Sequence, residues 1–470
     1  MTAVAAPARS RTRWLVLAVL CAAELVVVLD HTVLNVAVPA LTTELGAGAA
    51  EIQWIINGYA VAQAGLLLAA GAAADRYGRR RMLLAGLVVF GAGSLAAALA
   101  RTAGQLIAAR AGMGVGGALL LTATLAVAIQ VFDAEERPRA IGLWAAVSAF
   151  GFAGGPPLGG LILGHFWWGA IFLVNVPLIA VCLVAAWFLV PESRNPARGR
   201  PDLAGAALAT AGITALVYAI TAEQPLAAVA GGLLVAGFVA WERRAPEPML
   251  NLGFFRDRRF VGAVTGVVLI TFGSAGALFL LSMQLQFAGG HDPLAAGLRM
   301  VPFALTVVAL NAAGVSARVM KALGLPRAIA AGMTLLAAGL AVVAHVATGG
   351  YAGMLAGLLL MGAGCAVANP AIVEAVVSAV PPDEAGAGAG VEGTMTELGT
   401  GLGVAFLGTL TQARFAAAAP AAAAAFPAAL ASPDALDAFA AALRTSELVG
   451  ALTVFAGGCL TALLVHRSRR

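Results

Sequence analysis

Long apolar runs, separated by short polar breaks, follow one another along almost the whole chain. A helix rises 1.5 Å per residue, so a run of about 20 residues crosses a hydrocarbon layer of about 30 Å. The breaks hold charged residues, Gly and Pro, which are typical of loops. The pattern therefore predicts an all-α membrane protein with about 14 transmembrane helices. The expected spans are 14–38, 52–74, 82–100, 104–131, 139–163, 169–190, 203–222, 226–241, 260–288, 296–316, 327–347, 351–374, 386–412 and 447–465.

Two polar stretches interrupt this series. The connection at 191–202 is charged and Pro-rich, and it indicates a break after the first six spans. The Ala-rich stretch at 413–446 is the one long connection expected on the other side of the membrane. Within it, Ser432 can cap a short helix that begins at Pro433. An outer lid and low-complexity filler are both open interpretations of this stretch.

The composition agrees with a membrane protein. Of the 470 residues, 61% are hydrophobic and 11% are charged. Soluble domains carry about 25% charged residues, and no segment here is long and polar enough for a separate soluble domain. The four Cys fall in expected spans and the five His form no cluster. We therefore expect no disulfide, no metal site and no cofactor.

The distribution of positive charge predicts how the chain is oriented. The net charge is +5, but Lys and Arg fall between the apolar runs, so they indicate topology and not binding to nucleic acid. Most of the 28 Lys and Arg residues fall on one side of the expected membrane, which the positive-inside rule identifies as the cytoplasm. Both termini are therefore expected in the cytoplasm. The residues expected on the outer side are Arg101, Arg299, Arg414 and Arg444.

Ionisable side chains also occur inside the apolar runs. Glu24 and Asp30 lie in the first span and Arg110 in the fourth. A charge at membrane depth costs a few kcal/mol, so such residues usually mark an ion or substrate pathway. Asp30 lies about 24 Å from the inner end of its span and Arg110 about 9 Å from the outer end of its own, which are similar depths. We expect an Asp30–Arg110 interaction, direct or through water; the alternative is a buried structural pair.

Two more acids lie in the thirteenth span. Glu397 lies about 16 Å into that span and Glu24 about 15 Å into the first, so both are near the midplane. Transporter substrates bind near the midplane, between the two halves of the protein. Glu392 lies closer to the cytoplasmic side, where it would admit cations. We predict that at least Asp30 takes up and releases protons, and that Glu397 or Glu392 serves the cargo.

A compact motif follows the second span, with the pattern G-x3-D-R-x-G-R-R. Its key positions are Gly71, Asp75, Arg76, Gly78 and Arg79. Gly71 permits close helix contact, Gly78 permits a tight turn, and Asp75 can pair with an arginine or a helix N-terminus. An arginine cluster alone would be a topology signal, but the whole pattern resembles the signature loop of the major facilitator superfamily. A weaker second copy follows the tenth span at Gly314, Arg318, Lys321 and Gly324.

Two other motifs strengthen this resemblance. The block around Arg110 is similar to the superfamily's proton-coupling motif, although Met113 replaces its usual glutamine. In the fifth span, Gly151, Gly155 and Gly159 recur every four residues, and Pro156 bends the helix at that face. By itself this is ordinary helix packing, but at this position it resembles the motif that marks antiporters. The resemblance implies that Gly155, Pro156 and Gly159, like the loop after the second span, take part in conformational gating.

Longer blocks resemble the fourteen-span drug:proton antiporter family, in particular multidrug pumps of the QacA and SmvA kind. These blocks are Leu29–Pro39, Phe172–Pro177, Ala296–Pro302, Ala389–Gly399 and Gly401–Ala405. Some positions depart from the family pattern. Asn57 stands where these pumps carry an aspartate, so one acidic contact for cations is missing, and Gly169 replaces an arginine. His31 beside Asp30 either carries protons or fills space, and we favour the second.

The resemblance implies a major facilitator fold with two six-helix bundles. The N-terminal bundle would cover 14–190, two additional central helices 203–241, and the C-terminal bundle 260–465, including the outer loop 413–446. The implied site residues are Asp30, Arg110 and Glu24 for proton coupling, and Glu397, Glu392 and Asn57 for substrate binding.

The resemblance implies the function of a proton-coupled antiporter. The antiporter would export hydrophobic, cationic drugs across the cytoplasmic membrane by alternating access, acting as a monomer in the lipid bilayer. One alternative is a dedicated exporter of a single metabolite or self-made antibiotic. An enzyme is disfavoured because the chain lacks a nucleotide-binding loop of the G-x4-G-K-[ST] type and an H-E-x-x-H motif.

Overall fold

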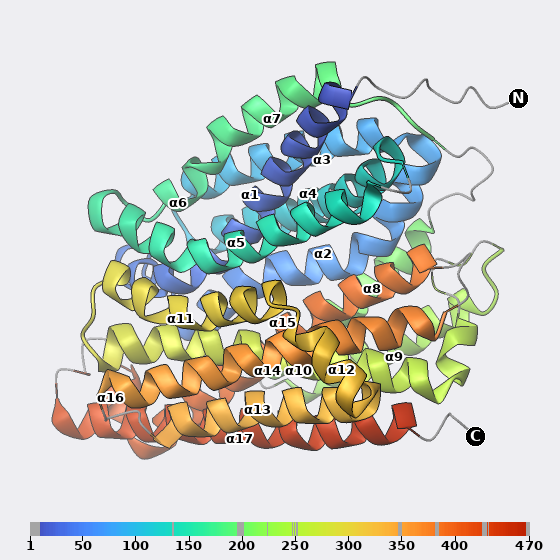
Figure 1. Cartoon of the computed structure of the whole chain (residues 1–470). Helices are drawn as coiled ribbons and strands as arrows, with labels where there is room; N and C mark the ends of the chain where they lie inside the picture. Colours follow the sequence, from blue (N-terminus) through green and yellow to red (C-terminus); the bar gives the residue numbers. More distant parts are fainter. Residues whose placement is uncertain are drawn as a thin grey trace, which may run out of the picture.

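The structure is a computed structural model in which every regular element of the described residues is a helix (Figure 1). The described residues are 10–133, 136–194, 202–222, 224–246, 248, 250, 252–345, 350–380, 385–424, 430 and 432–466.

Most helices are long enough to cross a bilayer. The long helices are α1 (Ser10–Glu44), α2 (Ala49–Tyr77), α3 (Arg79–Ala98), α4 (Ala103–Val131), α5 (Arg137–His165), α7 (Asn175–Leu189), α8 (Leu203–Thr221), α9 (Pro225–Glu242), α10 (Arg258–Met283), α11 (Pro293–Ala312), α13 (Leu325–His345), α14 (Tyr351–Ser378), α15 (Ala385–Ala418) and α17 (Pro433–His466). The shorter elements are α6 (Ala170–Leu173), the 3₁₀-helix η1 (Leu252–Arg256), the π-helix η2 (Gln284–Ala288), α12 (Val315–Leu323) and α16 (Pro420–Ala424).

Several helices begin where the sequence supplies a capping side chain. The Thr102 hydroxyl accepts from the Gln105 amide at 3.3 Å at the start of α4. The carboxylates of Asp202 and Asp292 cap α8 and α11 in the same way. Each cap satisfies a backbone N–H that has no partner within the helix, so the polar breaks in the sequence become helix boundaries.

Twelve helical segments within the described residues are long and apolar enough to span a membrane. Helices α5 and α15, of 29 and 34 residues, are not among the twelve. The protein is thus a multi-pass, all-helical membrane protein, and the count of fourteen spans stays a prediction.

Two expected boundaries were wrong. The expected span 169–190 agrees with the apolar segment Ala170–Leu189, in which α6 ends at Leu173 and α7 begins at Asn175. The expected span 296–316 ends earlier, at Ala312, and α12 is a separate helix. The expected outer loop 413–446 is largely helical, since α15 continues to Ala418 and α17 starts at Pro433 and runs without a break to His466. The Ser432 hydroxyl does cap α17, accepting from the Ala435 amide at 3.3 Å.

The helices are arranged around two large apolar cores. The first joins buried side chains of α1 to α7, with additions from α10, α15 and α17; the second lies within the stretch from Leu250 to Val465. In Figure 1, α1 to α7 occupy the upper part of the molecule and α13 and α17 the lower part. The first turn of α1 and the last turn of α17 lie at the same end of the bundle, on the right. We call this end the terminal face, and the other end the opposite face.

Helices α8 and α9 connect the two halves in the sequence and pack against each other. Val217 of α8 forms a small buried cluster with Val61 of α2 and Ala405 of α15. Gly65 of α2 leaves room for Thr210 of α8, because a Cβ there would collide with the threonine. Helix α8 therefore touches one helix from each half.

Candidate functional site

Asp30 of α1 and Arg110 of α4 form a buried ion pair near the middle of the N-terminal half. Both residues are at most 4% exposed. The Arg110 Nε also donates to the Ile55 carbonyl oxygen at 3.2 Å, and the Asn175 amide donates to Asp30 Oδ1 at 3.4 Å. The charges are therefore paired and hydrogen-bonded, which a charge needs when it is removed from water.

Aromatic rings enclose the guanidinium group of Arg110. Its Cζ lies 4.4 Å from the centre of the Tyr59 ring and 5.9 Å from that of Phe172. These cation–π contacts hold the positive charge in place without neutralising it. Asp30 is therefore the direct counter-charge of Arg110 in this cluster.

A second polar group joins the two halves. The Nε2 atom of His31, on α1, lies 3.9 Å from Glu397 Oε1, on α15. The Gln63 amide of α2 donates to the same oxygen at 3.2 Å. The other carboxylate oxygen of Glu397 is buried and has no hydrogen-bond partner in the described part of the chain. Glu397 thus retains an open acceptor position at the interface between α2 and α15.

Tyr59 lies between the two polar groups. Its ring packs edge-on against His31, with the ring centres 4.4 Å apart, and it also covers Arg110. Asp30 and His31 are neighbours in the sequence, so one segment of α1 contributes to both groups. The arrangement brings the Asp30–Arg110 pair and a carboxylate of the other half into one connected cluster.

Asn57 lies along the same α2–α15 interface. It is fully buried, and neither atom of its amide has a hydrogen-bond partner among the described residues. A Cβ on Gly401 of α15 would lie 3.5 Å from Asn57 Oδ1, so the amide faces that helix. A ligand at this position would find a donor and an acceptor that protein groups do not use.

Two predicted acids lie apart from this cluster. Glu24 is 2% exposed and precedes Asp30 by about 9 Å along α1. Glu392 is half-buried, and it accepts a hydrogen bond of 3.1 Å from the Thr396 hydroxyl of its own helix. Of the predicted residues, the structure therefore pairs Asp30 with Arg110 and places Asn57 against Gly401, four residues after Glu397 on α15. Glu24 lies further along α1, and Glu392 further along α15.

Sequence reasoning gave no role to Asn175, Tyr59 and Gln63. Asn175 falls in a block that resembles the antiporter family, and its place at the break between α6 and α7 would have been a signal. Tyr59 and Gln63 are polar residues within an apolar span, spaced four apart and thus on one face of α2. His31, which we expected to fill space, does pack on Tyr59 and also faces Glu397.

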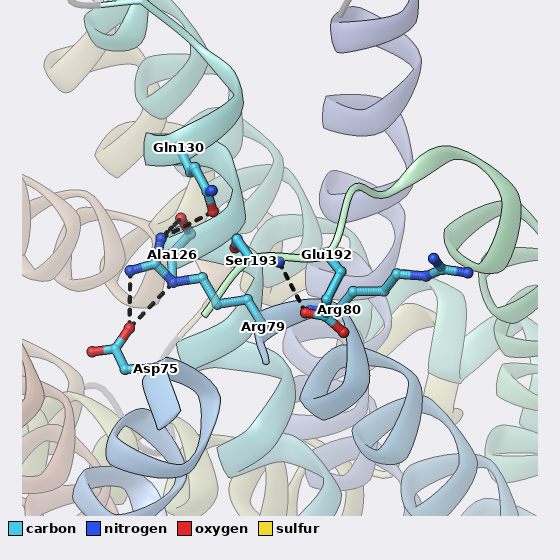
Figure 2. Close-up of polar contacts among 7 residues, drawn as sticks. All are labelled: Asp75, Arg79, Arg80, Ala126, Gln130, Glu192 and Ser193. Atoms are coloured by element: carbon cyan, nitrogen blue, oxygen red, sulfur yellow. Dashed lines mark hydrogen bonds and ion pairs between the residues drawn. The ribbon is translucent and has the colours of Figure 1, made fainter. Parts of the chain in front are cut away.

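The loop between α2 and α3 forms a separate network on the terminal face (Figure 2). The Arg79 side chain donates to Asp75 at 2.9 Å, to the Ala126 carbonyl oxygen at 3.3 Å and to Gln130 at 3.1 Å. These contacts tie the end of α2 and the start of α3 to the end of α4. The neighbouring motif residues Gly71 and Arg76 lie in the last two turns of α2.

Figure 2 also shows the segment after α7 lying against this loop. The Ser193 carbonyl oxygen accepts from the Arg79 amide at 2.9 Å, and the Glu192 carboxylate accepts from the Arg80 amide at 3.2 Å. Gly78 has a φ of +119° and thus a backbone conformation that favours glycine. Glu192 supplies the acceptor that Gly78, at the N-cap of α3, cannot provide.

Small residues of α5 bring α1 and α11 close. A Cβ on Gly155 would collide with Thr32 of α1, and one on Gly159 would lie 3.0 Å from a methyl carbon of Val33. On the other side, Gly297 of α11 lies against the Pro156 backbone. Helix α5 therefore contacts both halves through residues of the predicted gating motif.

The structure offers no assembled metal site among the described residues. No group of three His, Cys, Asp or Glu side chains there is arranged to hold an ion. The four cysteines, Cys21, Cys182, Cys365 and Cys459, are all free thiols.

Comparison with known proteins identifies the family. Residues 20–404 match the Major Facilitator Superfamily. The multidrug efflux pump LfrA of Mycolicibacterium smegmatis is 35% identical over 415 residues, covering 86% of this chain and 82% of LfrA. The methyl viologen resistance protein SmvA of Salmonella typhimurium is 34% identical, covering 86% of this chain and 84% of SmvA. The tetracenomycin C resistance and export protein of Streptomyces glaucescens is 30% identical, covering 85% and 76%.

Solved structures agree on the fold. A bacterial homologue of the human lysosomal transporter Spinster, in an inward-facing and unoccupied conformation, superposes with a TM-score of 0.71 at 17% identity, covering 97% of this chain and 98% of that one. A peptide transporter in complex with sulfate gives a TM-score of 0.64 at 16% identity, covering 96% and 95%. The chain is therefore a transporter and not an enzyme, and it belongs to the major facilitator superfamily.

Proposed function

We propose that this protein is a proton-coupled antiporter that exports hydrophobic, cationic compounds across the cytoplasmic membrane by alternating access. The observation that carries this proposal is the buried Asp30–Arg110 pair, joined through Tyr59 and His31 to Glu397 of the other half. Asp30 is the proton-binding group, Arg110 its counter-charge, and Glu397 the contact for the cargo. Glu24 and Glu392 extend the proton and cation pathways, and Asn57 contacts the cargo.

The coupling follows from charge balance. While Asp30 is ionised, its negative charge compensates the positive charge of Arg110, and the pair has no net charge. A proton on Asp30 leaves Arg110 uncompensated, and the resulting positive potential disfavours a cation beside Glu397. By linkage, a cation bound at Glu397 disfavours the proton on Asp30 to the same extent. Proton and cargo therefore exclude each other without sharing one carboxylate.

The family pattern extends this proposal to topology. Helices α5 and α15 would complete fourteen spans, with α8 and α9 as the two additional helices at 203–241 between bundles at 14–190 and 260–465. The terminal face would lie in the cytoplasm, because the positive charge gathers on that side. The loop from Gly71 to Arg79, and Gly155, Pro156 and Gly159 on α5, would control the change of conformation. The transporter would work as a monomer.

A second candidate function is the dedicated export of one compound. It is favoured by the relatives named as a tetracenomycin C export protein and a probable actinorhodin transporter. It is also favoured by Asn57, because an amide selects a cargo by hydrogen bonds and not by charge. A panel of dyes, biocides and antibiotics separates the two candidates, since a multidrug pump protects cells against many compounds and a dedicated exporter against one.

The first test is Asp30→Asn in protein reconstituted into vesicles. Uphill export of a fluorescent cation driven by a pH gradient should be lost, and equilibrium binding of the same cation should weaken and depend less on pH, because asparagine, like protonated Asp30, leaves Arg110 uncompensated. Asp437→Asn is the matched control, since Asp437 is exposed on α17. Glu397→Gln should weaken cation binding at every pH, because it removes the contact for the cargo and keeps Asp30. Unimpaired uphill export by Asp30→Asn would show that this carboxylate does not couple transport to protons.

A further inference from the structure

A cavity of about 320 Å³ lies between the two halves, toward the opposite face. Helices α1 and α2 line it on one side, α10, α15 and α17 line it on the other, and α16 contributes Ala423. This volume is at the lower end of the range of about 300–1,000 Å³ that is usual for small-molecule sites. The cavity is separate from the cluster of Asp30, Arg110 and Glu397, none of which lines it.

The lining of this cavity is aromatic and uncharged. Its large apolar side chains are Phe279, Met283, Phe415 and Phe439. Phe415 and Phe439 pack edge to face, with ring centres 5.4 Å apart. Its polar side chains are Thr42, Gln53, Thr411 and Gln412. Such walls fit a flat apolar ring system and offer amide and hydroxyl groups, but no counter-charge, to a cation.

The α2–α15 interface leads from Glu397 to this cavity. Gly408, on the cavity wall, follows Glu397 by about 16 Å along α15. Asn57 faces Gly401 between the two levels. Nearer the cavity, the Thr409 hydroxyl donates to Gln53 Oε1 at 3.1 Å, a further hydrogen bond between the halves besides that of Gln63 with Glu397. The Asn57 amide, which has no hydrogen-bond partner among the described residues, and the Gln53 amide, which accepts from Thr409, therefore lie along the way from Glu397 to the cavity.

We propose that this cavity is a second cargo subsite, occupied by lipophilic aromatic cations after they leave Glu397 and before they are released at the opposite face. The assignment rests on the proposed function, because it takes the cargo to be a cation that Glu397 binds and that leaves at that face. At Glu397 the cargo has a carboxylate partner, and in the cavity it keeps only contacts to rings and amides. Affinity therefore falls along the path, which favours release.

The test adds a carboxylate to the cavity. Gln412→Glu keeps the shape of a side chain that is exposed and lines the cavity. The probe is ethidium, a planar aromatic cation, and the readout is its equilibrium dissociation constant with protein in detergent. In a Glu397→Gln background, the added carboxylate should tighten ethidium binding at least tenfold. In otherwise unaltered protein, it should slow release at the opposite face, so that uphill export from vesicles falls while binding tightens.

Two further variants make the result specific to the cavity. Ala417→Glu places the same charge on an exposed position of α15 that does not line the cavity, and it should leave ethidium affinity unchanged. Ala423→Trp fills the cavity and should abolish the tightening caused by Gln412→Glu. The proposal is overturned if Gln412→Glu has no effect, if Ala417→Glu has the same effect, or if the tightening persists with Ala423→Trp. If a tightly bound lipid fills the cavity instead, Gln412→Glu should leave ethidium affinity unchanged, which is the first of these outcomes.

Failure of this proposal can be told from failure of the proposed function. The ethidium titration is an equilibrium measurement that requires no proton gradient. If Asp30→Asn exports normally, the proton-coupled function fails, whatever Gln412→Glu does to affinity. If Asp30→Asn and Glu397→Gln behave as expected and Gln412→Glu changes nothing, only the second subsite is lost.

Discussion

At the scale of single residues, burial of the Asp30–Arg110 pair costs free energy, and the same pair has a proposed role in transport. Two charges removed from water are tolerated because each compensates the other and because Ile55 and Asn175 complete their hydrogen bonds. Removing one partner leaves the other charge buried, whereas removing both leaves a neutral site. Stability and transport should therefore respond differently to single and double substitutions.

Arg110→Met should lower the free energy of unfolding by about 3–5 kcal/mol, the usual cost of breaking a buried ion pair from one side. Asp30→Asn combined with Arg110→Met should recover a large part of that loss, because no unpaired charge remains. Thermal unfolding in detergent provides the comparison. Neither variant should export uphill. A double variant as unstable as Arg110→Met alone would mean that the pair does not determine stability through its charges.

His31→Gln tests the connection between the pair and Glu397. Glutamine retains a hydrogen-bond donor toward Glu397 but cannot carry a charge beside Asp30, Arg110 and Tyr59. We expect cation binding to remain and the number of protons released per bound cation to fall. The measurement is proton release in weakly buffered solution on addition of a cationic dye. His345→Gln is the control, since that ring is exposed and its Nδ1 lies 2.8 Å from the Ala341 carbonyl oxygen of its own helix. Unchanged proton release with His31→Gln would show that the His31 ring serves packing and not proton transfer.

At the scale of helices, the α2–α3 loop depends on a residue from a distant element. Gly78 has a positive φ and has no side chain with which to cap α3, and Glu192 after α7 occupies the space beside it. A Cβ at Gly78 would lie 2.7 Å from the Glu192 Cδ. The loop and the segment after α7 are thus built as one unit, which links the end of the first six spans to the proposed gating motif.

Gly78→Ala should strain the backbone by about 1–3 kcal/mol and displace Glu192. We expect several-fold slower uphill export with unchanged equilibrium binding of the cargo, because the central cluster lies far along α2 from this loop. Transport rates in vesicles and dye titration in detergent measure the two effects. Gly237→Ala on α9 is the matched control, since a Cβ there meets no atom within 4 Å. Equal losses in both variants would argue against a specific role of the loop.

Much of the site could be predicted from the sequence where helix geometry alone decides it. The depths of Asp30 and Arg110 follow from a fixed rise per residue, so their similar level was calculable before the fold was known. The approach of His31 to Glu397 was not, because it depends on how the two halves dock. The extension of α15 to Ala418 was missed for another reason: Ala-rich sequence lacks a strong amphipathic pattern, although alanine favours helix.

At the scale of the whole molecule, the fold predicts a definite topology. If α5 and α15 cross the membrane, each of these helices must have one end on the cytoplasmic side and the other end outside. In a variant without native cysteines, Asp133→Cys and Ser378→Cys should react with an impermeant maleimide only from the cytoplasm. Phe166→Cys and Ala417→Cys should react only from outside. Reaction of both members of the α5 pair from one side would rule out fourteen spans.

The position of α8 has a consequence for how a lipid-soluble compound gains entry. Because α8 covers the line where α2 meets α15, acyl chains and compounds dissolved among them are kept out of that side. On the far side, the close approach of α5 to α11 through Gly297 and Gly160 closes the equivalent gap. Lateral diffusion from the bilayer is thus obstructed along both flanks, and a toxic compound must instead be captured from the water or headgroup region at the ends of the bundle.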